Sequence, residues 1–185
     1  MKRLVLWLLA LFMLIGFSGC ANKVHDYSVS ANNVVSLRNV ATNGTSINVG
    51  SFSDSNKEET KVMCRLATPI GTPKGETFAS YIKNAFQTEM IMSNIYDGKS
   101  DVTVTANLND IYGSTTLGNA YWEFKITIKS SNGVSYDVET RYDYESSFSA
   151  MSACSEMQRS FVPAVQKLNG EIINNPKFKN LLTSN

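Results

Sequence analysis

Four carboxylates recur close together in the second half of the chain, and their spacing could support acid–base chemistry. Side chains two residues apart on a strand lie on one face, so these acids could lie side by side. Glycoside hydrolysis uses two carboxylates that flank one bond, one of them with a pKa raised by burial. The same face also carries basic side chains, so we interpret it as a solvated, ionised sheet face rather than a catalytic cleft. The acids are Asp137, Glu139, Asp143 and Glu145, and the bases are Lys125, Lys129 and Arg141.

Other catalytic and metal-binding patterns do not occur in the sequence. A serine hydrolase or a zinc site would have to use His25, the only histidine, which lies in a polar segment near the start of the chain. No C-x-x-C pair supplies a resolving thiol, and the glycine-containing run at 68–75 lacks the spacing of a phosphate-binding loop. We therefore predict no enzymatic activity, no catalytic residue, no cofactor and no metal site.

The acids lie on a predicted hairpin at residues 120–144, which organises the rest of the fold. Apolar residues occupy every second position in both arms, a pattern typical of half-buried strands. A three-residue loop that ends at a left-handed Gly133 sets apolar residues opposite apolar ones and acids opposite bases. Each opposed charge pair favours this pairing by roughly 0.2–1 kcal/mol. The predicted pairs are Ile128–Tyr136, Ile126–Val138, Phe124–Thr140, Trp122–Tyr142, Lys125–Glu139 and Glu123–Arg141.

The remaining periodicity predicts strands and helices that would cover the hairpin. Alternation at 47–51, 62–66 and 102–108 predicts three more strands, of which the first two could pair with each other. Apolar stripes at helical spacing occur at 77–93 and 150–173, and we expect Pro163 to kink or divide the second helix. This β-α-β-β-β-α order predicts an α+β two-layer sandwich, with a mainly antiparallel sheet and two helices packed on one face.

Residues 1–19 have the layout of a secretory signal peptide. Lys2 and Arg3 precede an apolar run at 4–17, whose 14 helical residues would span about 21 Å, short of the roughly 30 Å hydrocarbon core of a bilayer. The run ends Phe17-Ser18-Gly19-Cys20, which resembles a bacterial lipobox. The resemblance implies cleavage before Cys20 and acylation of that residue, palmitate included, although a plain signal peptide with an incidental cysteine is the alternative.

The residue after the cysteine bears on location. In Gram-negative lipoproteins an Asp there usually means retention in the inner membrane, so Ala21 implies an outer-membrane anchor with the protein facing the periplasm. We predict a lipidated cysteine and tether at 20–46, mostly extended with a short strand laid on the domain. A single periplasmic α+β domain then follows at 47–185. Without Lys2 and Arg3 the 17 basic and 16 acidic residues leave a charge of about −1, so we predict no nucleic-acid binding.

Two cysteines remain after Cys20. Cys64 and Cys154 form an even pair in the oxidising compartment that a secretory signal implies. A disulfide between them would close a loop of about 90 residues, which chain entropy values at roughly 4–5 kcal/mol. The alternative is two buried free thiols.

The layout as a whole resembles the YajG-type bacterial lipoproteins. The segment CRLATPIGTPKGETFASYIKNAF at 64–86, with its Tyr81-Ile82 pair, and YDYESSF from Tyr142 resemble a pattern in uncharacterised proteobacterial lipoproteins. The cysteine pair departs from the YajG-type pattern, and the resemblance implies no catalytic residue.

Two functions follow as hypotheses. The first is a non-enzymatic, lipid-anchored envelope protein that docks a protein partner or supports an envelope assembly. The alternative is a carrier or sensor of a small apolar ligand held between sheet and helices. The residues available for such a ligand are Phe86, Met90, Trp122, Met157 and Phe161.

Overall fold

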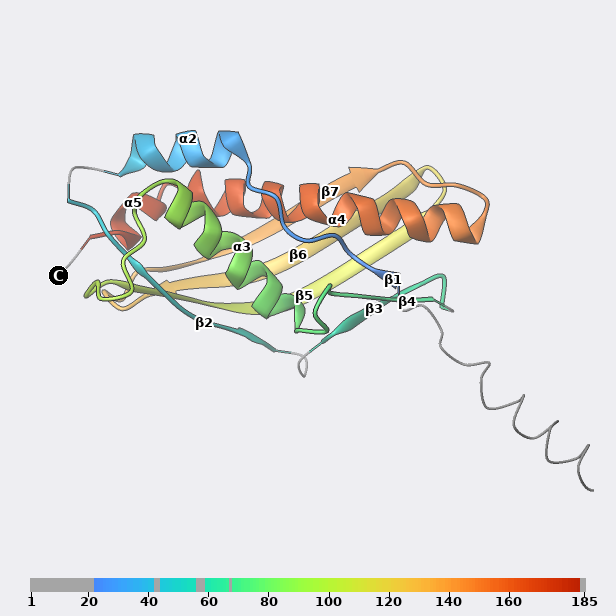
Figure 1. Cartoon of the computed structure of the whole chain (residues 1–185), viewed down its shortest axis with the longest axis horizontal. Coiled ribbons are helices and arrows are strands. Elements are labelled where there is room, and N and C mark those ends of the chain that lie inside the picture. The colour runs from blue at the N-terminus through green and yellow to red at the C-terminus, as the bar shows by residue number, and fades with distance from the viewer. Residues whose placement is uncertain (1–21, 42–43, 56–58, 67, 184–185) are drawn as a thin grey trace, which may run out of the picture.

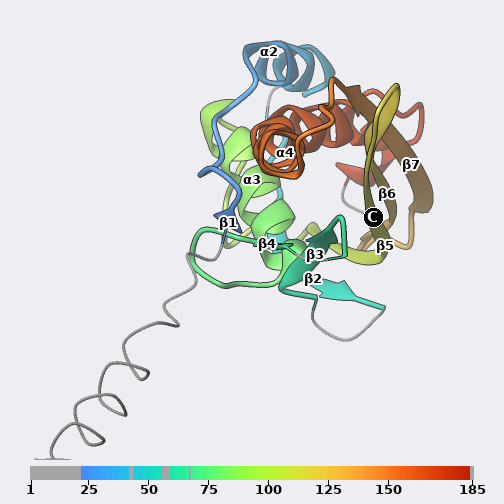
Figure 2. The same cartoon turned by 90° about the vertical axis from the view of Figure 1, so that its right-hand side faces the viewer.

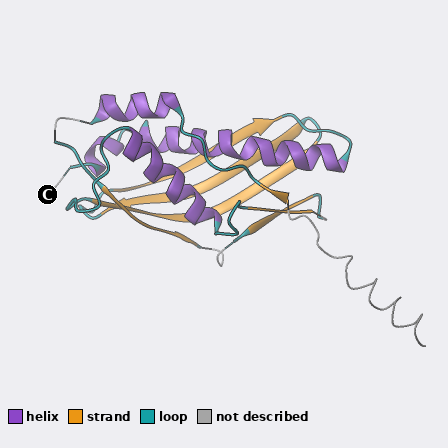
Figure 3. Cartoon of the chain, viewed as in Figure 1, coloured by secondary structure: helices purple, strands orange, loops and turns teal. Residues whose placement is uncertain are grey.

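A computed structural model describes residues 22–41, 44–55, 59–66 and 68–183 of the 185-residue chain. Helices cover one face of a four-stranded sheet, and a smaller three-stranded sheet lies at one end of the molecule (Figures 1 and 3). The predicted α+β architecture is confirmed. The elements are β1 (Asn22–Lys23), α2 (Ala31–Val40), β2 (Asn48–Asp54), β3 (Lys61–Cys64), β4 (Thr68–Gly71), α3 (Phe78–Met92), β5 (Thr103–Thr116), β6 (Asn119–Ser130), β7 (Ser135–Tyr144), α4 (Ala150–Ile173) and α5 (Phe178–Leu181).

The β6–β7 hairpin within the three-stranded meander β5-β6-β7 has the predicted register. Ile126 lies opposite Val138, and Lys125 lies opposite Glu139. The residues of the other predicted pairs also lie opposite each other. The loop closes with a hydrogen bond from Ser130 N to Val134 O, 2.9 Å long, and Gly133 has a φ of +90°. Glycine takes this left-handed conformation without a Cβ clash, and that explains why the three-residue loop forms here.

The fourth strand of the main sheet corrects a prediction. The alternation at 47–51 and 62–66 suggested that β2 could pair with β3. Instead, β2 pairs in parallel with β5 at the edge of the main sheet. β3 instead pairs with β4, and β1 adds to the other edge of β4. The connection from β2 to β5 passes through α3, which packs on β2 with the Phe52 and Phe86 rings 5.9 Å apart. Parallel strands need a crossover connection of this kind, and α3 covers the apolar face of β2.

Helices α3 and α4 cover the inner face of the sheet, and an aromatic cluster joins the two layers. The ring of Phe161 on α4 lies 4.9 Å from Trp122, 5.3 Å from both Phe78 and Tyr81, and 6.0 Å from Phe124. Tilted and edge-on contacts of this kind add to the stabilisation from burial alone. The two halves of the chain therefore share one core.

Helix α4 runs through Pro163 as one helix of 24 residues, so the proline does not divide it. The faces of α4 on both sides of Pro163 are buried, including Phe161 and Val165. Packing against the sheet keeps the helix together across the hydrogen bond that proline cannot donate.

The expected extended tether is wrong for residues 31–40, which form helix α2. Its N-cap is Ser30, whose hydroxyl accepts a hydrogen bond from Asn33 N. α2 packs against α4, where Leu37 is buried and Gly170 allows the close approach of the Asn33 side chain (Figure 2). The Asn-rich, β-branched sequence does not favour a helix by itself, and tertiary packing supplies the missing stability.

Candidate functional site

The four acids that the sequence singled out are exposed on and just after β7, and two of them, Glu139 and Asp143, are in ion pairs. Lys125 Nζ lies 3.3 Å from Glu139 Oε1, and Arg141 Nε lies 2.8 Å from Asp143 Oδ1. Glu139 raises the pKa of Lys125 by hydrogen bonding and by its charge. Arg141 also stacks on the Tyr121 ring at 3.5 Å rather than pairing with Glu123. This face is the charged surface expected from the sequence.

The residues considered for an apolar ligand form part of the core. Phe86, Met90, Trp122, Met157 and Phe161 are all fully buried. The indole nitrogen of Trp122 donates to the Met157 carbonyl at 3.0 Å, and the tip of Met157 packs on the backbone at Gly113. Four of the surface hollows on the described residues are lined by none of the five side chains.

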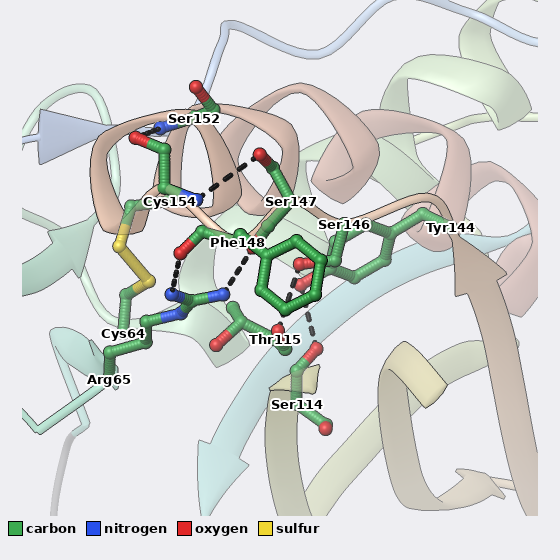
Figure 4. The surroundings of a disulfide bond; sticks show 11 residues. Cys64, Arg65, Ser114, Thr115, Tyr144, Ser146, Ser147, Phe148, Ser152 and Cys154 are labelled. Atoms are coloured by element: carbon green, nitrogen blue, oxygen red, sulfur yellow. Dashed lines mark hydrogen bonds between the residues drawn. A yellow bond between two sulfur atoms is a disulfide. The ribbon is translucent and has the colours of Figure 1, made fainter. Parts of the chain in front are cut away.

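The predicted disulfide is present. Cys64 at the end of β3 is bonded to Cys154 in the second turn of α4, with 5.8 Å between their Cα atoms (Figure 4). Next to it, the Arg65 guanidinium donates to the Phe148 carbonyl at 2.7 Å and to the Ser147 carbonyl. The disulfide and these hydrogen bonds fasten the β3–β4 turn to the loop between β7 and α4.

The end of β5 joins the same arrangement. Ser146 Oγ donates to the Thr115 carbonyl, and Tyr144 Oη donates to the Ser114 carbonyl, both at 2.8 Å (Figure 4). Three segments far apart in the sequence are thus held together at one end of the molecule.

Large apolar side chains are exposed to solvent at this end of the molecule. We call the surface that they form the apolar end. Leu66, Phe148 and Met151 are 93%, 86% and 84% exposed, the highest values among the large hydrophobic residues of the described chain. A groove of about 510 Å³ between β3 and β5 is lined in part by Leu66, Met63 and Tyr112. The apolar end comprises Met63, Leu66, Tyr112, Leu117, Phe148 and Met151.

Leu66 also has an unusual backbone. Its φ is +59°, and that of the preceding Arg65 is +47°. A non-glycine residue in this region costs about 1–3 kcal/mol and is retained only where its surroundings hold it in place. The bonds from Arg65 and the disulfide at Cys64 supply that restraint, so the turn projects Leu66 outward. Sequence reasoning missed this surface because exposed apolar residues resemble core residues in a hydropathy pattern.

A second feature that sequence reasoning missed is the buried carboxylate of Glu89 on α3. Its Oε1 accepts hydrogen bonds from Tyr27 Oη, from Ser30 N at 3.3 Å and from Asn33 Nδ2 at 3.0 Å. Burial raises the pKa of Glu89 above its ordinary value, and these hydrogen bonds oppose the shift. The one available signal was an acid within the apolar stripe of residues 78–90.

Tyr27, Ser30 and Asn33 belong to the segment that precedes the expected domain. Asn33 Nδ2 also donates to the Gln166 carbonyl at 2.8 Å, and Asn169 Nδ2 donates to Tyr27 Oη at 3.3 Å. Burial and the nearby Glu89 charge raise the pKa of Tyr27, so the phenol stays a hydrogen-bond donor. Glu89 therefore joins residues 27–33 to both α3 and α4.

The segment between β1 and Tyr27 is bound as well. Val24 is buried and its N–H donates to the Gly71 carbonyl at 2.8 Å. The Tyr81 hydroxyl donates to the His25 carbonyl at 2.8 Å, while the His25 side chain is exposed. Gln166 Nε2 donates to the Ser28 carbonyl at 2.7 Å. The chain from Asn22 to Val40 thus follows the surface of the domain.

The predicted signal peptide and lipidated Cys20 lie outside the described residues. Within the described ranges, no helix is long and apolar enough to cross a membrane. β1 begins at Asn22, two residues after Cys20.

Comparisons with known proteins bear on the fold. No protein-family model and no curated protein sequence matches the chain. The crystal structure of protein XCC0632 from Xanthomonas campestris, which carries the family description DUF330, is similar to this structure with a TM-score of 0.51. The alignment covers 70% of this chain and 84% of that chain at 10% sequence identity. The similarity establishes a shared fold with a bacterial protein.

Proposed function

We propose that this protein is a lipoprotein anchored through Cys20 to the periplasmic face of the outer membrane. In this proposal its domain docks an envelope protein or supports an envelope assembly, and it catalyses no reaction. The observation that carries the proposal is the binding of residues 22–40 along the domain, directly after the lipobox-like cysteine.

The bound segment explains what an anchor at Cys20 would achieve. Two residues reach at most about 7 Å, so an acylated Cys20 would hold the domain against the membrane surface rather than on a long tether. Three contacts bind this segment to the domain: the pairing of β1 with β4, the Tyr27–Glu89 hydrogen bond and the packing of α2. Such a connection suits a protein that presents one fixed surface to a membrane-associated partner.

The absence of catalysis in this proposal is supported by the state of the acids. Glu139 and Asp143 are exposed and paired with Lys125 and Arg141. The Glu89 carboxylate is fully buried, and protein donors already occupy it. A catalytic acid needs access to a substrate as well as a shifted pKa. The resemblance to YajG-type lipoproteins likewise implies no catalytic residue.

Metabolic labelling with a palmitate analogue tests the anchor. We expect label on the wild-type protein and none on Cys20→Ser, with the labelled protein in the outer-membrane fraction. Ala21→Asp is the matched control for sorting, because it retains the acylated cysteine and should move the protein to the inner membrane. An unlabelled wild-type protein, or equal labelling of Cys20→Ser, would refute the anchor.

Crosslinking in intact cells tests the partner. A photoreactive residue at the exposed position of Met92 on α3, away from the predicted anchor, should yield a discrete adduct with an envelope protein. The same substitution in a Cys20→Ser background is the control, because an unanchored domain should lose the adduct. Repeated failure to find any adduct from several exposed positions would contradict the docking role.

A further inference from the structure

The apolar end lies on the side of the molecule from which the chain enters β1. β1 runs parallel to β4, with Asn22 beside Ile70 and Lys23 beside Gly71. β4 begins at Thr68, directly after the turn that carries Leu66, so the chain enters β1 from the side of that turn. Figure 2 views this end, where β1, β3, β4 and the start of α4 lie together. An anchor two residues before Asn22 would therefore lie close to the apolar end.

We propose that the apolar end inserts into the interfacial region of the bilayer to which Cys20 is anchored. This inference rests on the proposed lipid anchor and extends it: the protein would contact the membrane through its own side chains as well as through its lipid. Leu66, Phe148 and Met151 provide the inserted groups, and no described residue covers them.

The distribution of charge fits this depth of insertion. Lys23 and Lys61 flank Gly71 on the two neighbouring strands, and both are exposed. Gly71 lies three residues from Thr68, which is about 10 Å along the strand from the turn. Apolar groups of interfacial segments enter about 5–10 Å into the boundary between headgroups and acyl chains. Insertion of the turn then places the backbone of both lysines at the level of the lipid headgroups, with Lys23 Nζ donating to the Pro73 carbonyl at 2.9 Å.

Insertion also requires a rigid support. The disulfide and the Arg65 hydrogen bonds to the 147–148 carbonyls fix the turn relative to α4. The turn that carries Leu66 and the loop that carries Phe148 are therefore held together before any membrane contact. Little conformational entropy remains to be lost when they enter the bilayer.

The position of the proposed anchor favours a bilayer over a protein partner as the binding partner of the apolar end. A lipid on Cys20 confines the apolar end to the membrane plane, where a second macromolecule would have to displace lipid to reach it. The exposed apolar residues elsewhere, such as Val35 on α2, lie on other elements and remain available to a protein partner.

The test uses the chain from Cys20 to Asn185, which contains every described residue. With Cys64 and Cys154 in the disulfide, Cys20 supplies the free thiol and can be coupled to maleimide-headgroup lipid in vesicles of phosphatidylethanolamine and phosphatidylglycerol. Phe148→Trp places a fluorophore at the apolar end, and Val35→Trp places one on α2 as the matched control. The buried Trp122 gives a background that the parent chain measures.

We expect the emission of Phe148→Trp to shift to shorter wavelength and to be quenched when the acyl chains are brominated. Val35→Trp should show neither change. Absence of quenching in coupled Phe148→Trp overturns the proposal, and quenching of Val35→Trp that equals or exceeds that of Phe148→Trp overturns the assigned orientation. A Leu66→Asp, Met151→Asp background should reduce the quenching of Phe148→Trp, and unchanged quenching in a folded, oxidised variant also counts against insertion.

This design separates the inference from the proposed function. The chemical coupling replaces the natural lipid, so the vesicle result stands whether or not cells acylate Cys20. Labelling in cells without quenching on vesicles would leave the lipoprotein in place and remove the insertion. Quenching on vesicles without labelling in cells would remove the natural anchor and leave a chain whose apolar end enters bilayers.

Discussion

The Tyr27 hydroxyl donates a hydrogen bond to the buried Glu89 carboxylate, across 62 residues of sequence. One partner belongs to the segment that follows Cys20, and the other belongs to the helix that packs on β2. The bond therefore joins the start of the described chain to the main core. Its consequences can be measured through stability, pH dependence and protease sensitivity.

Glu89→Ala should destabilise the protein and loosen residues 22–40. It removes the acceptor for three donors, and each buried donor left without a partner costs about 1–3 kcal/mol. Urea unfolding measures the loss, and limited proteolysis should cut the N-terminal segment before the rest of the chain. Glu139→Ala is the control, because an exposed ion pair contributes about 0–1 kcal/mol. Equal losses for both variants would contradict the role given to Glu89.

Stability should depend on pH through Glu89. Its pKa is raised in the folded protein, so between the unfolded value of about 4.3 and the raised value the folded state binds more protons. The stability that this group contributes is present below about pH 4.3 and is lost as the pH rises through the raised pKa. The slope is at most about 1.4 kcal/mol per pH unit.

Comparison with Glu89→Gln isolates that dependence. The difference in unfolding free energy, wild type minus Glu89→Gln, should decrease as the pH rises through this window. Tyr27→Phe removes a hydrogen bond that lowers the pKa of Glu89, so it should move the window to higher pH. A difference that stays constant with pH would show that Glu89 titrates as an ordinary glutamate.

Removal of the disulfide should lower the free energy of unfolding by about 2–5 kcal/mol. Its cysteines are 90 residues apart, and the chain entropy of so long a loop predicts a loss near the upper end of that range. The double variant Cys64→Ala, Cys154→Ala tests this by urea unfolding, beside the wild type under oxidising and reducing conditions. The double variant should be indifferent to reductant, while the wild type loses stability on reduction. A wild type that reductant leaves unchanged would mean that the bridge is not formed in solution.

Gly113→Ala should destabilise the contact between β5 and α4. A Cβ at this position would lie 2.1 Å from Met157 Cε and 3.1 Å from Trp122 Cζ3, and overpacking typically costs about 1–3 kcal/mol. Met157→Ala should relieve part of that cost, so the double variant is expected to be more stable than the sum of the single effects predicts. Additive effects would indicate that Met157 does not pack on Gly113.

The sequence was most informative where two independent patterns agreed. On the hairpin, the pairing of Ile126 with Val138 and that of Lys125 with Glu139 require the same register, and Gly133 permits the loop. The cysteine pair was predictable because its partners were few. Local patterns of this kind specify a structure when they support one another.

The errors arose where distant packing decides the structure. The apolar pattern of β2 suits any neighbouring strand, and only the path through α3 places it parallel to β5. Helix α2 has a sequence with weak helix propensity and is stabilised by Leu37 against α4 and by Asn33 on Glu89. The apolar end was missed for a similar reason: hydropathy does not distinguish a side chain that faces the core from Leu66, which faces solvent.

The strand order gives the acids of β7 a role other than catalysis. β7 is one of the two edge strands of the main sheet, so its free edge offers hydrogen-bonding groups to any other extended chain. Along β7 from Asp137 onward, the exposed side chains at alternate positions are charged: Asp137, Glu139, Arg141 and Asp143. We expect charged side chains on an edge strand to disfavour pairing between the sheets of neighbouring molecules.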